Sequence, residues 1–469
     1  MEAFRRASAE ASDWIAQYMG DMARFRINPE MRPGDLIDRL PATGPESGET
    51  LEQILADFEN LILPAVTHWN HPRFFNYFAC TASVPGVIAE MLTASMNTNG
   101  LNWIASPAVS ELEQVVLAWL RQWMGLSGDY FGEIFDTASI STLHAVMAAR
   151  EWIDPDVRLN GITKPLIVYS SDQAHSSIDK AVAAAGIGLR NLRKIASDDQ
   201  FRMRPEALRD AMAADAAAGL TPCCVIVSAG TTSTTSVDPL EPILDIAAVY
   251  NAWVHIDSAY AGAAALLPEF AWMLKGNERA HSLVINPHKW LFTPMDCSAF
   301  YTRYPDVLRR TFTITPEYLK TTGDPREVSL MDYGVALGRR FRALKLWYVL
   351  RYFGRTVLQE LIRGHIAMAQ ELGRWVSADD RFELAAPVPF SAVCFRIRDS
   401  EEKTRALVSA VNSTGAFFIS QTVLKGRYAA RVAIGNQATS REDVKALWAE
   451  ITRLAGGLKF NAAVFNSPA

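Results

Sequence analysis

Strand-like and helix-like segments alternate through the middle of the chain, and this alternation constrains the fold more than any other feature of the sequence. The predicted strands lie at 166–170, 223–228, 253–257 and 283–285, with predicted helices at 178–185 and 239–250. Such alternation is typical of a mostly parallel sheet covered by helices, which places the chain in the α/β class. Because ligands of these sheets bind beyond the carboxyl ends of the strands, the residues that follow each strand are the first candidates for a functional site.

The two ends of the chain are patterned differently from the middle. Residues 1–80 predict a helical N-terminal arm followed by a proline-rich connector. The apolar face of the first helix comprises Trp14, Ile15, Tyr18, Met19 and Met22. Near the C-terminus, strands at 392–397 and 429–434 and a closing helix predict a small α+β domain. We therefore expect an arm (1–80), a large domain (81–345) and a small C-terminal domain (346–469).

Charge and cysteine usage narrow the class of protein. The formal net charge of −5 and the pI near 6.0 give no electrostatic sign of a nucleic-acid partner or an anionic membrane. The five cysteines are an odd number without metal-ligand spacing, which favours reduced thiols and no metal site. The N-terminus has no signal-like apolar region and no apolar run reaches transmembrane length, so we expect a cytoplasmic protein that acts on small molecules.

The segment Asn286-Pro287-His288-Lys289-Trp290 follows an apolar run and places a lysine in hydrophobic, aromatic surroundings. Burial of an ammonium group is unfavourable unless the group is paired or neutralised, and a lowered pKa makes the amine a nucleophile toward aldehydes. A lysine at the end of a strand can also extend its amine to solvent. The choice between these interpretations depends on the other polar segments.

Two further segments favour the nucleophile. Asp257 ends a predicted strand, and Ala259 two residues later leaves room for a ring to approach closely. His175 follows another strand and offers a planar imidazole. An aldehyde-bearing pyridine cofactor needs a lysine for its aldehyde, an acid for its ring nitrogen, a flat group for its ring face and a cradle for its phosphate. The first three are Lys289, Asp257 and His175.

The fourth requirement is met by the segment from Phe135 to Ser139, which opens a predicted helix. Backbone N–H groups at the start of a helix, together with the helix dipole, attract anions. We assign Ala138 and Ser139 to the phosphate, although the same segment alone would be an ordinary helix cap.

These segments resemble the group II pyridoxal-phosphate (PLP) decarboxylases, in the aromatic-L-amino-acid decarboxylase branch. The motifs are Asn-Pro-His-Lys-Trp at 286–290, His-x-Asp-x-Ala-Tyr-Ala-Gly at 255–262 and Ser-Ser-Asp-Gln-Ala-His-Ser-Ser at 170–177. The resemblance covers about residues 10–455. It implies PLP fold type I, related to aspartate aminotransferase, with Lys289 holding the cofactor, Asn286 and His288 helping to hold its phosphate, and Thr232 supplying a nearby hydroxyl.

The resemblance also implies a homodimer whose active sites lie at the subunit interface, with the N-terminal arm wrapping the partner; docking of the arm on its own domain is the alternative. A flat apolar pocket suits an aromatic side chain. The residues implied to line it are Trp69, Tyr77, Cys80, Leu101 and Trp103. Cys80 departs from the family, which usually carries a hydroxyl residue there.

A second departure lies in the segment that, in the family, supplies a tyrosine for proton donation from a mobile loop. Leu330 occupies that position in Leu330-Met331-Asp332-Tyr333-Gly334, and leucine has no proton to donate. Tyr333 either replaces the missing phenol or simply packs. Loss of the phenol is associated, within the family, with aldehyde synthases.

We therefore expect decarboxylation of an aromatic L-amino acid to the amine and CO2, with Lys289, His175, Asp257 and Tyr333 as the catalytic residues. The alternative on the same scaffold is decarboxylation-dependent oxidative deamination to an aromatic acetaldehyde, motivated by Leu330. An aminotransferase and a non-catalytic binding module are less compatible with the motifs, since none of Lys289, Asp257 and His175 is lost.

Overall fold

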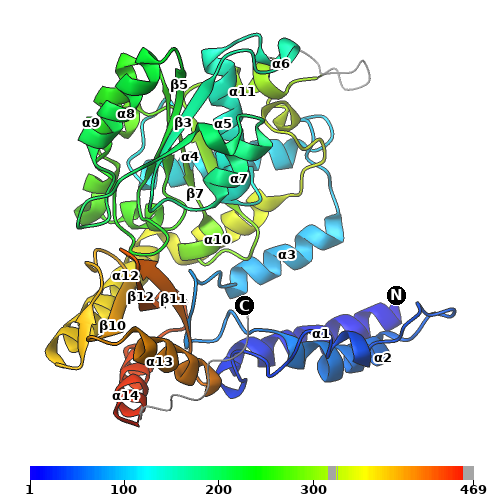
Figure 1. The fold of residues 1–469 in the computed structure, drawn as a ribbon. Coiled ribbons are helices and arrows are strands. Elements are labelled where there is room, and N and C mark those ends of the chain that lie inside the picture. The colour runs from blue at the N-terminus through cyan, green and yellow to red at the C-terminus, as the bar shows by residue number, and fades with distance from the viewer. Residues whose placement is uncertain (315–323, 325, 458–469) are drawn as a thin grey trace. The chain divides into compact units, whose positions relative to one another are not determined.

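The computed structural model describes residues 1–314, 324 and 326–457, and the chain divides into two compact units. The larger unit comprises residues 80–373 and 386–394, and the smaller comprises 1–79, 374–385 and the C-terminal residues from 395. Figure 1 shows the course of the chain through both.

The larger unit is organised on a seven-stranded sheet with the order β2-β8-β7-β6-β5-β3-β4. Strands β7, β6, β5, β3 and β4 pair in parallel, while β8 is antiparallel to both of its neighbours. The strands are β2 (Phe131–Phe135), β3 (Leu166–Ser171), β4 (Leu192–Ile195), β5 (Thr221–Ser228), β6 (Trp253–Asp257), β7 (Ser282–Ile285) and β8 (Ser298–Thr302). The prediction of a mostly parallel sheet is confirmed.

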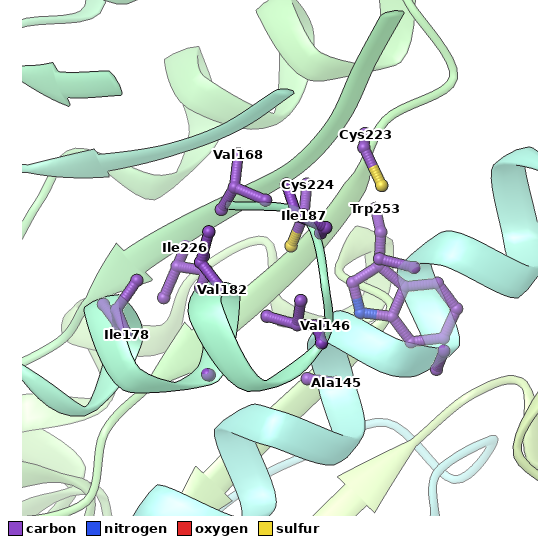
Figure 2. Close-up of a cluster of buried hydrophobic side chains, with 14 of the residues drawn as sticks. Ala145, Val146, Val168, Ile178, Val182, Ile187, Cys223, Cys224, Ile226 and Trp253 are labelled. Carbon is purple, nitrogen blue, oxygen red and sulfur yellow. The ribbon is translucent and has the colours of Figure 1, made fainter. Parts of the chain in front are cut away.

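Helices cover both faces of this sheet, with α8 (Pro205–Ala217) and α9 (Leu240–Val249) on one side of β3 and β5 (Figure 1). On the other side, α5 (Ala138–Ile153) and α7 (Ser177–Ala184) pack on a cluster of buried apolar side chains from β3, β5 and β6. Figure 2 shows Val146 of α5 and Val182 of α7 directed toward Val168 and Ile226 of the strands. The strands are buried on both faces, which explains why they read as nearly continuous apolar runs.

The strand directions place the carboxyl ends of several strands at the same end of the sheet. Because β8 is antiparallel to both β2 and β7, β2 points in the same direction as β7, β6, β5 and β3. Asp257 lies level with Ser228 of β5 and Val284 of β7. Neighbouring strands lie about 4.8 Å apart, so residues that follow these carboxyl ends lie close together.

The smaller unit contains a five-stranded sheet with the order β1-β11-β12-β10-β9. Its strands are β1 (Phe74–Phe75), β9 (Phe382–Leu384), β10 (Ala392–Ile397), β11 (Phe418–Leu424) and β12 (Arg427–Ala433), accompanied by α13 (Glu401–Ser413) and α14 (Arg441–Gly457). The N-terminal segment adds β1 to this sheet in parallel with β11, and Ile27 packs with Phe74, Ala79 and Phe418. The α+β character predicted for the C-terminal part is confirmed.

The N-terminal arm is helical, as predicted, in α1 (Glu2–Gly20) and the short α2 (Leu51–Asp57). Helix α1 has no buried residue, although its Trp14 and Tyr18 stack with ring centroids 5.0 Å apart. The Tyr18 hydroxyl also hydrogen-bonds the Nδ1 atom of His68, at 2.8 Å.

The division into compact units differs from the predicted boundaries of 1–80, 81–345 and 346–469. Residues 1–79 join the C-terminal sheet because β1 pairs with β11, and 346–373 join the larger unit. These latter residues belong to the long helix α12 (Arg342–Ala378), whose helical path is interrupted at Gly354. Its Gln359 donates a hydrogen bond to the Leu266 carbonyl and the imidazole of His365 accepts one from Trp290, both within the larger unit.

A buried cluster of charges joins the segment before α12 to the edge of the sheet. The Arg339 guanidinium donates to Glu113 of α4 (Pro107–Trp123) at 2.8 Å, to Glu133 of β2 and to the Ile134 carbonyl. All three charged side chains are nearly inaccessible to solvent. Burial raises the pKa of Glu133, and the charge of Arg339 opposes that rise.

Replacement of Arg339 by methionine should lower stability strongly, because it leaves two buried carboxyl groups without their cation. Removal of one partner of a buried pair costs about 3–5 kcal/mol. The neighbouring Arg340 pairs with Glu90 but is half exposed, so Arg340→Met should cost less than about 1 kcal/mol. Thermal unfolding followed by circular dichroism measures both, and equal losses in the two variants would contradict a dominant role for the buried cluster.

Candidate active site

Lys289 lies in α10 (Pro287–Trp290), a four-residue helix that follows the carboxyl end of β7. The side chain of Lys289 is partly buried, and its two neighbours in the chain are fully buried. The Nδ1 atom of His288 accepts a hydrogen bond from the Cys297 backbone N–H at 2.9 Å. Burial, and then the charge of Lys289, lower the pKa of His288 to about 3, so this imidazole is neutral.

Asp257 is the last residue of β6, and β6 lies next to β7 in the sheet. One carboxylate oxygen accepts the backbone N–H of Ala259 at 3.1 Å, which orients the side chain at the strand end. The Ala259 carbonyl in turn accepts the backbone N–H of Asn286 at 2.9 Å. The loop that carries Asp257 is thereby tied directly to the turn that carries Lys289.

His175 lies in the short turn between β3 and α7 and keeps an exposed ring face. Its Nδ1 atom accepts the backbone N–H of Ser177 at 3.1 Å, so the proton of the neutral ring resides on Nε2. Partial burial lowers the pKa of His175; the Asp257 carboxylate acts in the opposite direction, and Lys289 adds to the lowering. The three predicted catalytic groups are therefore close enough for their charges to act on one another.

The predicted phosphate cradle has the features of an anion site. Thr137 is the N-cap of α5 but forms no side-chain cap, so the expectation of a hydroxyl cap is not met there. Within the described part of the chain, the backbone N–H groups of Ala138 and Ser139 have no hydrogen-bond partner. The Asn286 Oδ1 atom is also buried without a partner among the described residues, but as a hydrogen-bond acceptor it does not contribute to an anion site.

The remaining predicted cofactor contacts lie at the same edge. Thr232 follows β5 and is exposed, whereas Ala259 is buried. Gly230, just before Thr232, has φ +105°, and a Cβ there would lie 2.4 Å from the Ala261 Cβ. The loop after β5 thus packs tightly on the loop that carries Ala259, which requires glycine at position 230.

The predicted substrate-pocket residues divide between the two units. Trp69 and Tyr77 belong to the smaller unit, where their rings stack with centroids 5.4 Å apart and an interplanar angle of 11°. Cys80, Leu101 and Trp103 belong to the larger unit. Burial raises the pKa of the Cys80 thiol, and the charge of Lys289 opposes that rise, which places Cys80 within electrostatic reach of the lysine.

The segment with Leu330 and Tyr333 packs along the larger unit, while residues 315–323 and 325 of the preceding loop lie outside the described residues. Leu330 is fully buried, and the backbone N–H of Met331 donates to the Leu101 carbonyl at 2.9 Å. The ring of Tyr333 stacks on Phe131 at 4.6 Å. Val335 donates its N–H to the Nε2 atom of His144 at 3.1 Å, which holds the segment against α5.

The contact with Phe131 bears on the question of whether Tyr333 replaces the missing phenol. Phe131 begins β2 and Phe135 ends it, so Phe131 lies about 13 Å along the strand from the edge where the other groups meet. Burial raises the pKa of Tyr333, and its ring packs against the apolar cluster under α5. This placement supports the packing alternative, and catalysis by Tyr333 stays a prediction.

The residues present fit a pyridoxal phosphate group. A lysine, a carboxylate at a strand end, a planar imidazole and unpaired N–H groups at a helix start supply the contacts that such a group requires. The fold and the site together define a PLP enzyme of fold type I.

Comparison with known proteins identifies the family. The pyridoxal-dependent decarboxylase conserved domain matches residues 33–398. Tyrosine decarboxylase 2 of Narcissus pseudonarcissus is 40% identical over 95% of this chain and 93% of its own length. Phenylacetaldehyde synthase of Arabidopsis thaliana is also 40% identical, over 93% and 92%. The crystal structure of Oryza sativa TDC with PLP and tryptamine has a TM-score of 0.95 at 36% identity, covering 97% of this chain and 98% of that one.

The chain therefore belongs to the group II pyridoxal-dependent decarboxylases, in the branch that includes the aromatic-amino-acid decarboxylases. Its cofactor is PLP.

Several residues around the site were not singled out from the sequence. Tyr260 and Trp290, each inside a recognised motif, stack face to face, and His365 of α12 accepts a hydrogen bond from Trp290. The density of aromatic residues in the motifs was a signal for the first two. Nothing in the sequence around His365 distinguishes it from an ordinary helix residue.

Lys289→Ala should abolish both turnover and the visible absorption of lysine-bound PLP, since no other amine is proposed to hold the aldehyde. Absorption spectroscopy of the purified variant after addition of PLP measures this directly. Lys194→Ala, which removes a half-exposed lysine paired with Asp179, is the matched control and should leave the spectrum unchanged. Normal turnover by Lys289→Ala would show that the catalytic centre is misassigned.

Proposed function

We propose that the protein decarboxylates an aromatic L-amino acid, using PLP held by Lys289, with the aryl amine and CO2 as products. The observation that carries this proposal is the convergence of Lys289, Asp257 and His175 at the carboxyl edge of the sheet, on a chain similar to tyrosine and tryptophan decarboxylases. PLP, when bound, accepts the electron pair that departure of CO2 leaves at the substrate Cα.

Each residue has a role that follows from its charge and position. Asp257 keeps the pyridine nitrogen protonated, because an adjacent carboxylate favours the cationic form. His175 covers one ring face and, with its proton on Nε2, has a donor available for transfer. The N–H groups of Ala138 and Ser139 hold the phosphate, and Asn286 assists only through its side-chain N–H donors. Thr232 contributes a hydroxyl and Ala259 the space for the ring.

Within the larger unit, the substrate side chain is proposed to lie against the apolar residues Leu101 and Trp103. Aromatic rings present large apolar faces with little conformational freedom, which suits an indole or phenyl group. Trp103 is fixed by a hydrogen bond from its Nε1 atom to Glu111, at 2.8 Å. Cys80 and Leu330 complete this proposed lining.

Oxidative deamination to an aromatic acetaldehyde is the second candidate, and two observations favour it. Leu330 cannot donate a proton. Tyr333 packs on Phe131, at the amino-terminal end of β2 and away from the carboxyl ends where the other groups lie. In this reaction the amino acid, O2 and water give aldehyde, CO2, ammonia and hydrogen peroxide, with O2 as the two-electron oxidant. Phenylacetaldehyde synthases are among the relatives of the chain, at similar identity to the decarboxylases.

A product assay decides between these outcomes and includes a variant that restores the phenol. With phenylalanine, tyrosine, dopa or tryptophan, the amine pathway gives one amine per CO2 without O2 uptake, and the aldehyde pathway consumes one O2 per CO2. Leu330→Tyr should raise the ratio of amine to aldehyde by about tenfold or more, since a positioned general acid typically contributes about 100-fold. Tyr333→Phe is the control, and it should leave the ratio unchanged if Tyr333 only packs.

We also propose a homodimer, on the basis of an apolar helix face. In α3 (Val84–Met96), exposed apolar residues recur at helical spacing, namely Val84, Ile88, Met91, Leu92 and Met96, each at least 40% accessible in the single chain. An exposed stripe of this kind marks an interaction surface. A second copy of the chain is the proposed occupant, as the family resemblance implies. The absence of buried residues in α1 agrees with an arm that also contacts a partner.

A charge in this stripe should disrupt the dimer. Ile88→Asp should shift the mass measured by light scattering from twice the 51.9 kDa chain mass toward a single chain, and activity should fall with it if the site lies at the interface. Val249→Asp, at an exposed apolar position at the end of α9, is the matched control. A wild-type protein with the mass of one chain would contradict the proposal.

The cellular location is proposed to be the cytoplasm. All five cysteines carry free thiols, as expected of a reducing compartment. Across the described residues, no helix has both the length and the apolar character needed to span a membrane.

A further inference from the structure

The helix that carries Lys289 cannot hold its own orientation. Isolated helices shorter than about 12 residues are marginal in water, and α10 has four residues. Its direction is therefore set by tertiary contacts of the residues beside the lysine. His288 provides one such contact through the Cys297 backbone, and Trp290 provides the others.

Trp290 is fully buried and is held in two independent ways. Its indole stacks on the ring of Tyr260, with centroids 4.6 Å apart and an interplanar angle of 8°. Its Nε1 atom donates a hydrogen bond to Nδ1 of His365, at 2.9 Å, and the two rings are parallel within 11°. Tyr260, Trp290 and His365 thus form a group of three parallel rings, named the ring stack, with Trp290 in the middle. Tyr260 lies against the face of the indole, and His365 lies beside its edge.

Tyr260 belongs to the loop of Asp257, so this stack joins the two loops that carry the charged groups of the site. Tyr260 is three residues beyond Asp257, and its hydroxyl hydrogen-bonds the buried hydroxyl of Ser391. Between these loops there is also the backbone hydrogen bond from Asn286 to Ala259. Rotation of the Trp290 ring would therefore disturb the orientation of α10 and the position of the Asp257 loop together.

We infer that Tyr260, Trp290 and His365 are positioning residues that set the orientation of Lys289 relative to Asp257. This inference rests on the proposed roles of these two residues. In this role the stack acts by fixing the loops that hold the reacting atoms. The two residues that flank Trp290 depend on segments toward the C-terminus. His365 lies in α12, and Tyr260 is hydrogen-bonded to Ser391, one residue before β10. The geometry of the site thus depends on segments more than seventy residues beyond the last catalytic motif.

The test measures cofactor binding together with kinetics. Trp290→Phe keeps an aromatic ring but removes the donor to His365, and His365→Leu removes the acceptor; each should raise the Kd for PLP about three- to tenfold. His365→Asn keeps an acceptor near the position of Nδ1 and should recover most of the loss. The kcat should fall in Trp290→Phe and His365→Leu and fall less in His365→Asn. The KM for the amino acid should change less than about twofold, because a positioning role leaves the substrate contacts in place.

A pair of phenylalanine variants separates positioning from general stability. Tyr260→Phe and Tyr301→Phe each remove one buried phenol hydrogen bond, to Ser391 and to the Leu117 carbonyl respectively. Both should lower the Tm to a similar extent, but only Tyr260→Phe should weaken PLP binding. Equal effects of the two on the Kd for PLP, or PLP affinity within about twofold of wild type in Trp290→Phe and His365→Leu, would overturn the inference.

Lys289→Ala in the same series distinguishes failure of the inference from failure of the proposed function. If this variant loses the absorption of lysine-bound PLP while the stack variants bind PLP as the wild type does, only the positioning role is overturned. If Lys289→Ala keeps that absorption, the role of Lys289 itself is wrong.

Discussion

The parallel pairing of β3, β5, β6 and β7 is the constraint on which the site depends. The carboxyl ends of these strands lie at the same end of the sheet. Strand pairing alone therefore brings together residues that are far apart in the sequence. Asp257 ends β6, Lys289 follows the neighbouring strand β7, and His175 follows β3. The strands are buried on both faces, and the apolar contacts under α5 and α7 therefore stabilise the same arrangement that aligns the catalytic groups.

Ion pairs and hydrogen bonds, rather than apolar packing, hold the segment before α12. These contacts matter for the chemistry because the segment contains Tyr333. Arg339 pairs with two buried carboxylates, and Val335 donates to His144, whose Nδ1 hydrogen-bonds the Ile140 carbonyl. Burial lowers the pKa of His144 to about 4, so the neutral ring can accept and donate at once. A Cβ at Gly334 would lie 3.0 Å from the Phe135 ring, which shows how closely this segment approaches β2. This docking packs the partly buried ring of Tyr333 against the apolar cluster under α5.

The sequence predicted most of the fold, and the reason is visible in particular elements. The apolar runs located β3, β5, β6 and β7 to within two residues, since parallel strands buried on both faces leave strong local signals. The predicted boundary at residue 345 differs from the structure because α12 packs by contacts such as Trp290 to His365, which no local pattern reveals. The same holds for the pairing of β1 with β11 and for the charge cluster of Arg339. The motif residues were located by resemblance, whereas the residues that orient them emerged only from the packing.

Electrostatics explains why the surroundings of Lys289 are built from neutral groups. Two imidazoles lie near this amine, and protonation of either would add a second positive charge in a poorly solvated environment. Burial lowers the pKa of both His175 and His288, and the charge of Lys289 lowers them further, so at neutral pH both rings stay uncharged. With both imidazoles neutral, neither of them competes as a cation for the nearby Asp257 side chain. Positive potential for the phosphate comes instead from the start of α5, where backbone dipoles supply it without an ionisable group. The site thus separates its two charge requirements, with the Lys289 amine at the aldehyde end and fixed backbone dipoles at the phosphate end.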